Sequence, residues 1–259
     1  MPYATNPTDG MKIHYDVEGE GPPLVLHHGP YRSLEGWRDE GYTDSLKKDH
    51  RLIALDARGH GQSGKPHKAD SYSMELRVSD VTSILDELGV EQAHYFGYSM
   101  GAHTGFGLLK HAPERIASFV LGGMAPDARD PEPLNRRAQA LRAGMEPVVA
   151  ASEIQAGERM AEPRRSTLLA NDAEALAELT LAIRDTPSLE DGLAPAMQPC
   201  LIFAGDQDPV HDFAQRAAEQ IPNGSFVSLP GLAHLAGFQR SDVVLPHVTE
   251  FLASVAASP

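Results

Sequence analysis

Short apolar runs separated by amphipathic stretches form the main pattern along the chain. Six runs are long and apolar enough to be strands buried on both faces, with glycine or aspartate at or near the end of each. They lie at 22–29, 51–61, 92–101, 116–124, 199–208 and 224–231. Four other stretches, at 75–89, 101–115, 212–222 and 241–256, carry apolar residues at helical spacing. This alternation predicts an α/β fold with a mostly parallel, doubly wound sheet.

Two segments depart from this rhythm. Residues 11–22 alternate apolar and polar positions and end in a Gly-rich turn, which predicts an antiparallel edge strand ahead of the parallel set. Residues 125–195 are rich in Ala, Glu, Arg and Leu and contain no convincing strand. We interpret 125–195 as a helical cap inserted over the carboxyl edge of the sheet, where such folds bind ligands. The core then consists of 1–124 and 196–259, a length that suits one domain with an insertion.

Composition narrows the class of protein. The formal net charge is −14 and basic residues form no run longer than a pair such as Arg164-Arg165, which argues against a nucleic-acid surface. No long apolar run suggests a membrane span. The first 21 residues lack a basic region followed by an apolar stretch, and the lone Cys200 excludes an internal disulfide. We expect a soluble, cytoplasmic protein.

The strongest chemical signal is Gly97-Tyr98-Ser99-Met100-Gly101, a G-x-S-x-G motif between an expected strand and an expected helix. A serine on so tight a turn needs small neighbours, and the turn pushes its hydroxyl clear of the backbone. The motif therefore predicts a nucleophilic Ser99. The alternative is a Gly-rich strand-to-helix turn in which the serine only caps the helix.

A serine hydroxyl is a poor nucleophile until a base takes its proton, so a histidine and an orienting acid are expected further along the chain. Asp206 and Asp208 end a late strand, and His234 follows the last one. The order serine, acid, histidine is that of a hydrolase triad. Asp208 is the preferred acid because Pro209 fixes a loop position beyond the strand, whereas Asp206 remains the alternative.

Together these motifs resemble the α/β-hydrolase superfamily over nearly the whole chain. The resemblance lies in HHG at 27–29, LDARGHGQS at 55–63, the serine motif, GDQDPV at 205–210 and LPGLAH at 229–234. GYSMG and the small cap are similar to non-haem haloperoxidase-like esterases and 3-oxoadipate enol-lactonases, which hydrolyse esters or lactones without a cofactor. The resemblance also favours Asp208 as the acid and implies that His28 shapes the oxyanion loop.

The resemblance raises a question about the oxyanion hole. It implies one donor from the Met100 N–H and a second from the residue after His-Gly, but that residue is Pro30, which has no N–H. A missing donor corresponds to roughly 3 kcal/mol of transition-state stabilisation. Tyr31 then donates through its backbone or its phenol, or the protein is not an acyl-transfer enzyme. Cocaine-esterase-like hydrolases use the phenol of a similar Pro-Tyr pair, so we expect the Tyr31 phenol. A stiff turn with the ring packed under the cap is the alternative.

These residues predict a serine hydrolase that cleaves a small carboxylic ester or lactone through an acyl-enzyme. An amidase, C–C hydrolase or perhydrolase on the same triad is an alternative, as is a ligand receptor with low turnover. No cofactor or metal is expected, since no histidine pairs with carboxylate or thiol at metal-ligand spacing. Trp37 and Met124 are candidate substrate contacts; core packing is the alternative for both and the favoured interpretation for Trp37.

Overall fold

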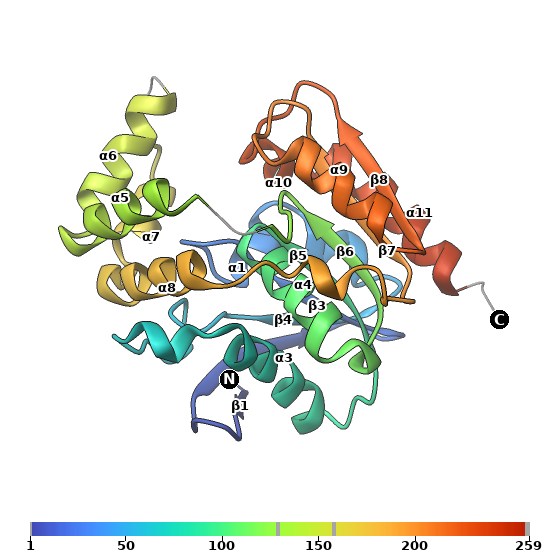
Figure 1. Cartoon of the computed structure of the whole chain (residues 1–259). Helices are drawn as coiled ribbons and strands as arrows, with labels where there is room; N and C mark the ends of the chain where they lie inside the picture. The colour runs from blue at the N-terminus through green and yellow to red at the C-terminus, as the bar shows by residue number, and fades with distance from the viewer. Residues whose placement is uncertain (1, 128–129, 157–158, 257–259) are drawn as a thin grey trace.

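The computed structural model describes residues 2–127, 130–156 and 159–256. Its centre is an eight-stranded sheet in the order β1-β2-β4-β3-β5-β6-β7-β8 (Figure 1). The strands are β1 Tyr3–Thr5, β2 Lys12–Glu18, β3 Pro23–His27, β4 Arg51–Leu55, β5 Ala93–Tyr98, β6 Ile116–Gly122, β7 Cys200–Gly205 and β8 Gly224–Leu229. Each of the six apolar runs contains one strand from β3 to β8. The expected α/β fold with a mostly parallel sheet is confirmed.

Strands β3 to β8 are parallel to their neighbours, whereas β2 pairs antiparallel with β4. The antiparallel direction of β2 is therefore as expected, but its place at the edge is wrong. The short β1 pairs outside it, antiparallel, with Ala4 opposite Ile13. The other edge also differs from expectation, because β8 was expected to be buried on both faces, whereas three of its six residues are partly buried and two are exposed. An edge strand has one neighbour, so less of it is covered than of a central strand.

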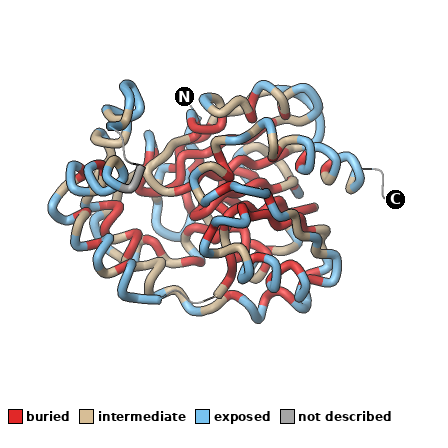
Figure 2. The backbone as a smooth tube through the Cα atoms, turned by 90° about the horizontal axis from the view of Figure 1, so that it is seen from above, coloured by how far each residue is buried: buried red, intermediate tan, exposed pale blue. Residues whose placement is uncertain are grey.

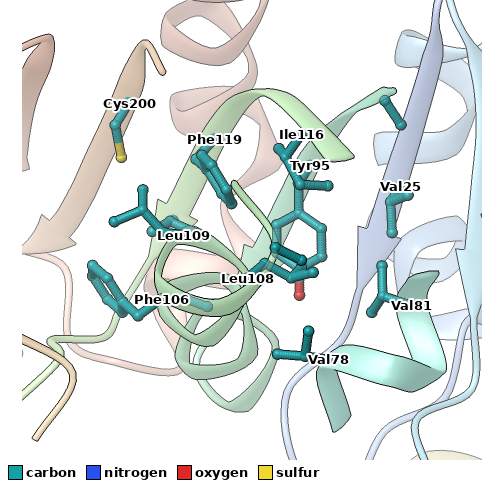
Figure 3. Close-up of a cluster of buried hydrophobic side chains, with 14 of the residues drawn as sticks. Val25, Val78, Val81, Tyr95, Phe106, Leu108, Leu109, Ile116, Phe119 and Cys200 are labelled. Atoms are coloured by element: carbon teal, nitrogen blue, oxygen red, sulfur yellow. The ribbon is translucent and has the colours of Figure 1, made fainter. Parts of the chain in front are cut away.

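Side chains of the central strands alternate between two apolar cores, as the pleat requires. Along β5, Tyr95 enters one core and Phe96 the other. Along β7, Ile202 and Phe203 alternate in the same way. Figure 3 shows the first core, with Val25, Tyr95, Phe119 and Cys200 among its side chains. Both faces of the sheet are consequently covered by helices.

The helices that flank the sheet form two sets. The first core includes side chains of α3 Met74–Glu87, α4 Met100–His111 and α9 His211–Gln220. The second includes side chains of α1 Glu35–Asp39, α2 Tyr42–Leu46, α10 Ala236–Gln239 and α11 Ser241–Ala256. Short 3₁₀ turns lie at Ala69–Tyr72, Pro113–Arg115 and Glu190–Gly192. Figure 2 shows that buried backbone is concentrated in the middle of the molecule and exposed backbone on the helices around it.

In its described residues, the segment between β6 and β7 contains four α-helices, which we call the cap helices. They are α5 Pro131–Arg142, α6 Met145–Ala156, α7 Arg164–Leu169 and α8 Ala173–Asp185. Asp130 accepts the backbone N–H of Glu132 at the start of α5, and Asp172 accepts that of Ala175 at the start of α8. The cap helices lie together at one side of the sheet, opposite β8 and α11 (Figure 1). A third apolar cluster joins them to Met100 and Tyr72.

The register of the parallel strands aligns their carboxyl ends. His27 lies opposite Gly97, and Tyr98 lies opposite Gly122. Gly122 in turn lies opposite Phe203 on β7. The loops after β3, β5, β6 and β7 therefore emerge side by side, although they are far apart in the sequence. Ligands of open α/β sheets bind at this edge.

Candidate active site

Ser99 occupies the sharp turn between β5 and α4. Its backbone has φ 54° and ψ −111°, a conformation that side chains rarely adopt. Both motif glycines are required by close packing. A Cβ on Gly97 would lie 2.5 Å from the carbonyl carbon of Gly101, and a Cβ on Gly101 would lie 2.0 Å from the carbonyl oxygen of His27. The expectation that small residues permit this turn therefore has a steric basis in the structure.

His234 and Asp208 lie beside Ser99 in the geometry of a catalytic triad. The Nε2 atom of His234 is 3.0 Å from Ser99 Oγ, and its Nδ1 is 2.7 Å from Asp208 Oδ2. The other carboxylate oxygen of Asp208 accepts the N–H of Val210 at 3.1 Å. The Asp208 side chain is 1% exposed, whereas that of His234 is 42% exposed. A buried carboxylate thus contacts a histidine whose side chain is partly open to solvent, the arrangement of a catalytic triad.

Asp206 binds the backbone of the histidine loop. Its carboxylate accepts the backbone N–H of Gly231 at 2.8 Å, in the loop that leads to His234. The residue itself is exposed. Of the two carboxylates considered from the sequence, the structure places Asp208 beside the histidine and gives Asp206 a role in loop shape.

Tyr98, the residue before the serine, was not identified from the sequence. Its hydroxyl donates a hydrogen bond to the backbone carbonyl of His234 at 2.5 Å. Its side chain fills the space next to two glycines. An added Cβ on Gly123 would lie 2.8 Å from the ring and from its hydroxyl, and one on Gly237 would lie 2.6 Å from the hydroxyl. Tyr98 therefore ties the histidine loop to the serine turn. The position of this tyrosine within the G-x-S-x-G motif was the sequence signal that could have identified it.

His28 holds the loop that faces Ser99. Its Nδ1 lies 2.7 Å from the carbonyl oxygen of Gly29, and its Nε2 accepts the N–H of Ala57 at 3.0 Å. Because Nε2 accepts a hydrogen bond, the proton of the neutral His28 ring is on Nδ1. Nδ1 therefore donates to the carbonyl oxygen of Gly29. Burial lowers the pKa of His28, which favours this neutral form. A Cβ on Gly29 would lie 3.4 Å from Ser99 Cβ, so the loop passes directly beside Ser99.

Pro30 and Tyr31 follow Gly29 in this loop. Tyr31 has φ 65°, in the left-handed region, and its carbonyl accepts Asn171 Nδ2 at 3.3 Å. A proline followed by a residue with positive φ is typical of a type II turn. Met100 is the first residue of α4, so its N–H has no acceptor within the helix. The serine turn and this loop thus approach each other from two strands.

The triad opens into a pocket of about 1050 Å³ between the sheet edge and the cap helices. Ser99, Met100, Tyr31, Asp208 and His234 all line it. Much of the remaining wall is apolar, with Leu134, Leu176, Leu179, Ile183, Val210 and Phe213 among its residues.

The two candidate substrate contacts have different outcomes. Met124 lines the pocket. Trp37 does not: it is fully buried, with its ring centroid 4.8 Å from that of Phe96 and 5.0 Å from that of Phe238. Trp37 belongs to the second core, so the core-packing alternative replaces its assignment as a substrate contact.

No group of three or more His, Cys, Asp or Glu side chains in 2–127, 130–156 and 159–256 has the arrangement of a metal site. None of the helices in these ranges combines the length and the apolar character that a membrane crossing requires.

Comparisons with known proteins agree with this geometry. Residues 22–216 match the family model described as alpha/beta hydrolase fold. A non-heme haloperoxidase from Rhodococcus erythropolis is 27% identical, over 98% of this chain and 100% of the relative. An enol-lactonase structure from Burkholderia xenovorans has a TM-score of 0.85 and 26% identity, over 97% of this chain and 100% of that one. A hydrolase structure from Pseudomonas aeruginosa has a TM-score of 0.83 and 28% identity, over 99% and 98%.

The family resemblance expected from the sequence is thereby confirmed, including its narrower part toward haloperoxidases and enol-lactonases. The family match covers most of the chain, and these three relatives align with it over 97% to 99% of its length. The chain therefore belongs to the α/β-hydrolase fold family and is an enzyme.

Proposed function

We propose that this enzyme cleaves a carboxylic ester or lactone through an acyl-enzyme formed on Ser99. The observation that carries the proposal is the continuous pair of contacts from Ser99 Oγ to His234 and from His234 to Asp208, at 3.0 and 2.7 Å, on the wall of a large pocket. The enol-lactonase and haloperoxidase relatives support the same class of reaction.

The proposed reaction has two halves. Ser99 Oγ attacks the carbonyl carbon while its proton passes to His234 Nε2, and the Asp208 carboxylate stabilises the resulting imidazolium. Collapse of the tetrahedral intermediate breaks the C–O bond, and His234 gives its proton to the leaving alcohol oxygen. A water molecule then attacks the acyl-enzyme with His234 as base, which releases the acid and restores Ser99.

The oxyanion is proposed to receive hydrogen bonds from the Met100 N–H and from the Tyr31 phenol. Tyr31 lines the same pocket as Ser99, and Pro30 has no N–H to offer. Burial raises the pKa of the phenol above its usual 10.0, so its proton stays available to donate at neutral pH. The phenol has no hydrogen-bond partner among the residues that the structure describes. The ring also packs against the cluster under the cap helices, which is the basis of the stiff-turn alternative.

The test is stoichiometric labelling and mutation of the triad. We expect a fluorophosphonate probe to label wild-type protein once, at Ser99, and Ser99→Ala to lose both labelling and hydrolysis of p-nitrophenyl esters. Asp208→Asn is expected to lower kcat by about 10⁴-fold because the histidine loses its orientation and its counter-charge. Asp206→Asn is the matched control and should stay within a few-fold of wild type.

Two results would overturn the proposal. One is turnover of esters by Ser99→Ala at a rate close to wild type. The other is a folded wild-type protein that neither reacts with the probe nor cleaves any member of a panel of p-nitrophenyl esters, lactones and anilides. The second result would favour a ligand receptor.

A further inference from the structure

A second, much smaller cavity lies beside the first turns of α4. Its volume is about 10 Å³, which is roughly the space that one water molecule needs. Its lining residues include Met100 and Thr104 on α4, Arg77 on α3 and His27 at the end of β3. Every residue that lines it is buried. A ligand of this cavity is therefore small and shielded from bulk solvent.

Two polar atoms of the lining residues have no hydrogen-bond partner among the residues that the structure describes. They are Nε of Arg77 and Nε2 of His27, and both atoms are buried. The other two guanidinium nitrogens of Arg77 each lie 3.5 Å from His103 Nδ1. Asp80, the carboxylate in the cavity wall, is paired instead with Arg58 at 2.6 Å. Buried polar groups without a partner are rare because each costs free energy, so two of them on one cavity point to a bound ligand.

The hydrogen bonds of Tyr95 determine which nitrogen of His27 carries the proton. The phenol oxygen lies 2.7 Å from the carbonyl oxygen of Gly101, so the phenol proton must lie between these two oxygens. The phenol oxygen therefore accepts a hydrogen bond from Nδ1 of His27, at 2.8 Å. Burial lowers the pKa of His27 well below its usual 6.5, which favours the neutral ring with a single proton. Nε2 of His27 consequently keeps its lone pair and can only accept.

Arg77 has the opposite requirement, because its Nε carries a proton and can only donate. Burial lowers the pKa of Arg77 to about 10, so the guanidinium is still charged at neutral pH. A water oxygen can accept from Arg77 while one of the water protons is donated to His27. The hydroxyl of Thr104 donates to the Met100 carbonyl at 3.2 Å, and its oxygen can accept the second water proton. A chloride ion could accept from Arg77 but would face the lone pair of His27.

We propose that this cavity binds one water molecule, which accepts a hydrogen bond from Arg77 Nε and donates one to His27 Nε2. The inference concerns the fold around the serine motif and does not depend on the proposed reaction. With the water in place, hydrogen bonds continue without a gap from α3 through His27 and Tyr95 to the carbonyl of Gly101, the last residue of the motif. The water is then part of the structure that holds the turn between β5 and α4.

A high-resolution crystal structure of the wild-type protein tests the site directly. We expect one ordered water whose oxygen lies about 2.7–3.2 Å from both Arg77 Nε and His27 Nε2. In crystals soaked in sodium bromide, the anomalous signal of bromide should be absent from this position. A cavity without solvent density, or with bromide in it, would overturn the inference.

Nitrogen-15 NMR of the histidine rings is an independent test on the wild-type protein, with His27→Leu used to assign the signals. We expect His27 to stay neutral from about pH 5 to 8, with its proton on Nδ1. A proton on Nε2 would make both unpartnered atoms donors. That result would favour an anion in the cavity and contradict the water.

A double-mutant cycle tests whether the water couples two side chains that share no direct hydrogen bond. Arg77→Met and His27→Leu each remove one partner of the water, so their effects on the unfolding equilibrium constant should be non-additive by about 2- to 10-fold, the range for one hydrogen bond. Urea denaturation measures this constant. The matched control pairs Arg77→Met with His94→Leu, because His94 is a partly buried histidine of β5 outside the cavity wall, and this cycle should be additive. Additive effects in the first cycle, or equal coupling in both, would contradict the shared water.

Discussion

Backbone strain in the described part of the chain lies at two non-glycine residues with positive φ, and both line the pocket. They are Tyr31 at 65° and Ser99 at 54°. Each such conformation costs on the order of 1–3 kcal/mol, which the surrounding structure has to hold in place. The Ser99 N–H donates to the Gly122 carbonyl at 2.8 Å, and the Ser99 carbonyl accepts from His103 at 2.9 Å. The neighbouring strand and the following helix therefore fix the turn that presents the Ser99 side chain.

Tyr31→Phe tests the proposed second oxyanion donor. Removing one hydroxyl should lower kcat about 10²–10³-fold with little change in KM, because the bond strengthens mainly as the oxyanion forms. Steady-state kinetics with a neutral p-nitrophenyl ester measure both constants. If Tyr31 instead donates through its backbone, or only stiffens the turn, the phenylalanine variant should retain activity within a few-fold of wild type.

Pro30→Gly complements this variant. It restores an N–H at the position that the family resemblance assigns to the second donor, so it is expected to recover part of the activity lost in Tyr31→Phe. Greater freedom of the loop offsets some of this gain.

At the residue scale, the sequence was sufficient for side chains that belong to local motifs. Ser99, Asp208 and His234 each follow a strand in a recognisable context, and their order along the chain is the basis of the roles proposed for them. Tyr98 was missed because its partner is a backbone carbonyl 136 positions away, which no local pattern marks. The cavity beside Arg77 depends on how α3 and α4 pack, and the burial of Trp37 depends on the contacts of α1.

At the element scale, α4 is formed by packing more than by helix propensity. It contains glycines at 101, 105 and 107, each of which disfavours a helix by about 1 kcal/mol relative to alanine. They allow close approach instead. A Cβ on Gly105 would lie 2.4 Å from Leu121, and one on Gly107 would lie 2.2 Å from Met74. The helix that presents Met100 is thereby seated tightly on the sheet and on α3.

Gly101→Ala tests this close packing, since its Cβ would meet the His27 backbone, which has no side-chain freedom to move aside. We expect the free energy of unfolding to fall by about 1–3 kcal/mol, the usual effect of overpacking, as measured by urea denaturation. Gly36→Ala in α1 is the control, because its nearest contact is a 3.6 Å approach to the Arg32 side chain. That variant should be neutral or slightly more stable. Equal stability of the two variants would contradict the steric argument.

Elements were predictable from sequence where burial is complete. Strands β3 to β7 are mostly apolar because helices cover both faces, and such runs are conspicuous. The three residues of β1 are too few to show a period, so their pairing outside β2 was not foreseen. For β8 the apolar run was visible, but a run does not tell how many neighbours a strand has.

At the scale of the whole molecule, the two segments that connect the cap helices to β6 and β7 are hydrogen-bonded to each other. The N–H of Leu189, on the segment that returns to β7, donates to the carbonyl of Pro126, on the segment that leaves β6, at 2.9 Å. Beside this bond the carboxyl groups of Asp127 and Glu190 share a hydrogen bond. Burial, together with the hydrogen bond and charge of Glu190, raises the pKa of Asp127 above its usual 3.8. Ionisation of Asp127 therefore destabilises the contact between these two segments.

Asp127→Asn should remove this effect in a pH-dependent way. In the wild type the folded pKa of Asp127 exceeds the unfolded one, so the destabilisation is absent below about pH 4 and complete once the pH passes the folded value. We expect the variant to raise Tm by about 1–3 °C at pH 8, because partly exposed carboxylates contribute less than about 1 kcal/mol, and to have no advantage at pH 4. Asp70→Asn, at an exposed residue, is the control and should not shift Tm with this pH dependence. A gain confined to pH 4 would contradict the argument, because the repulsion it removes requires an ionised Asp127.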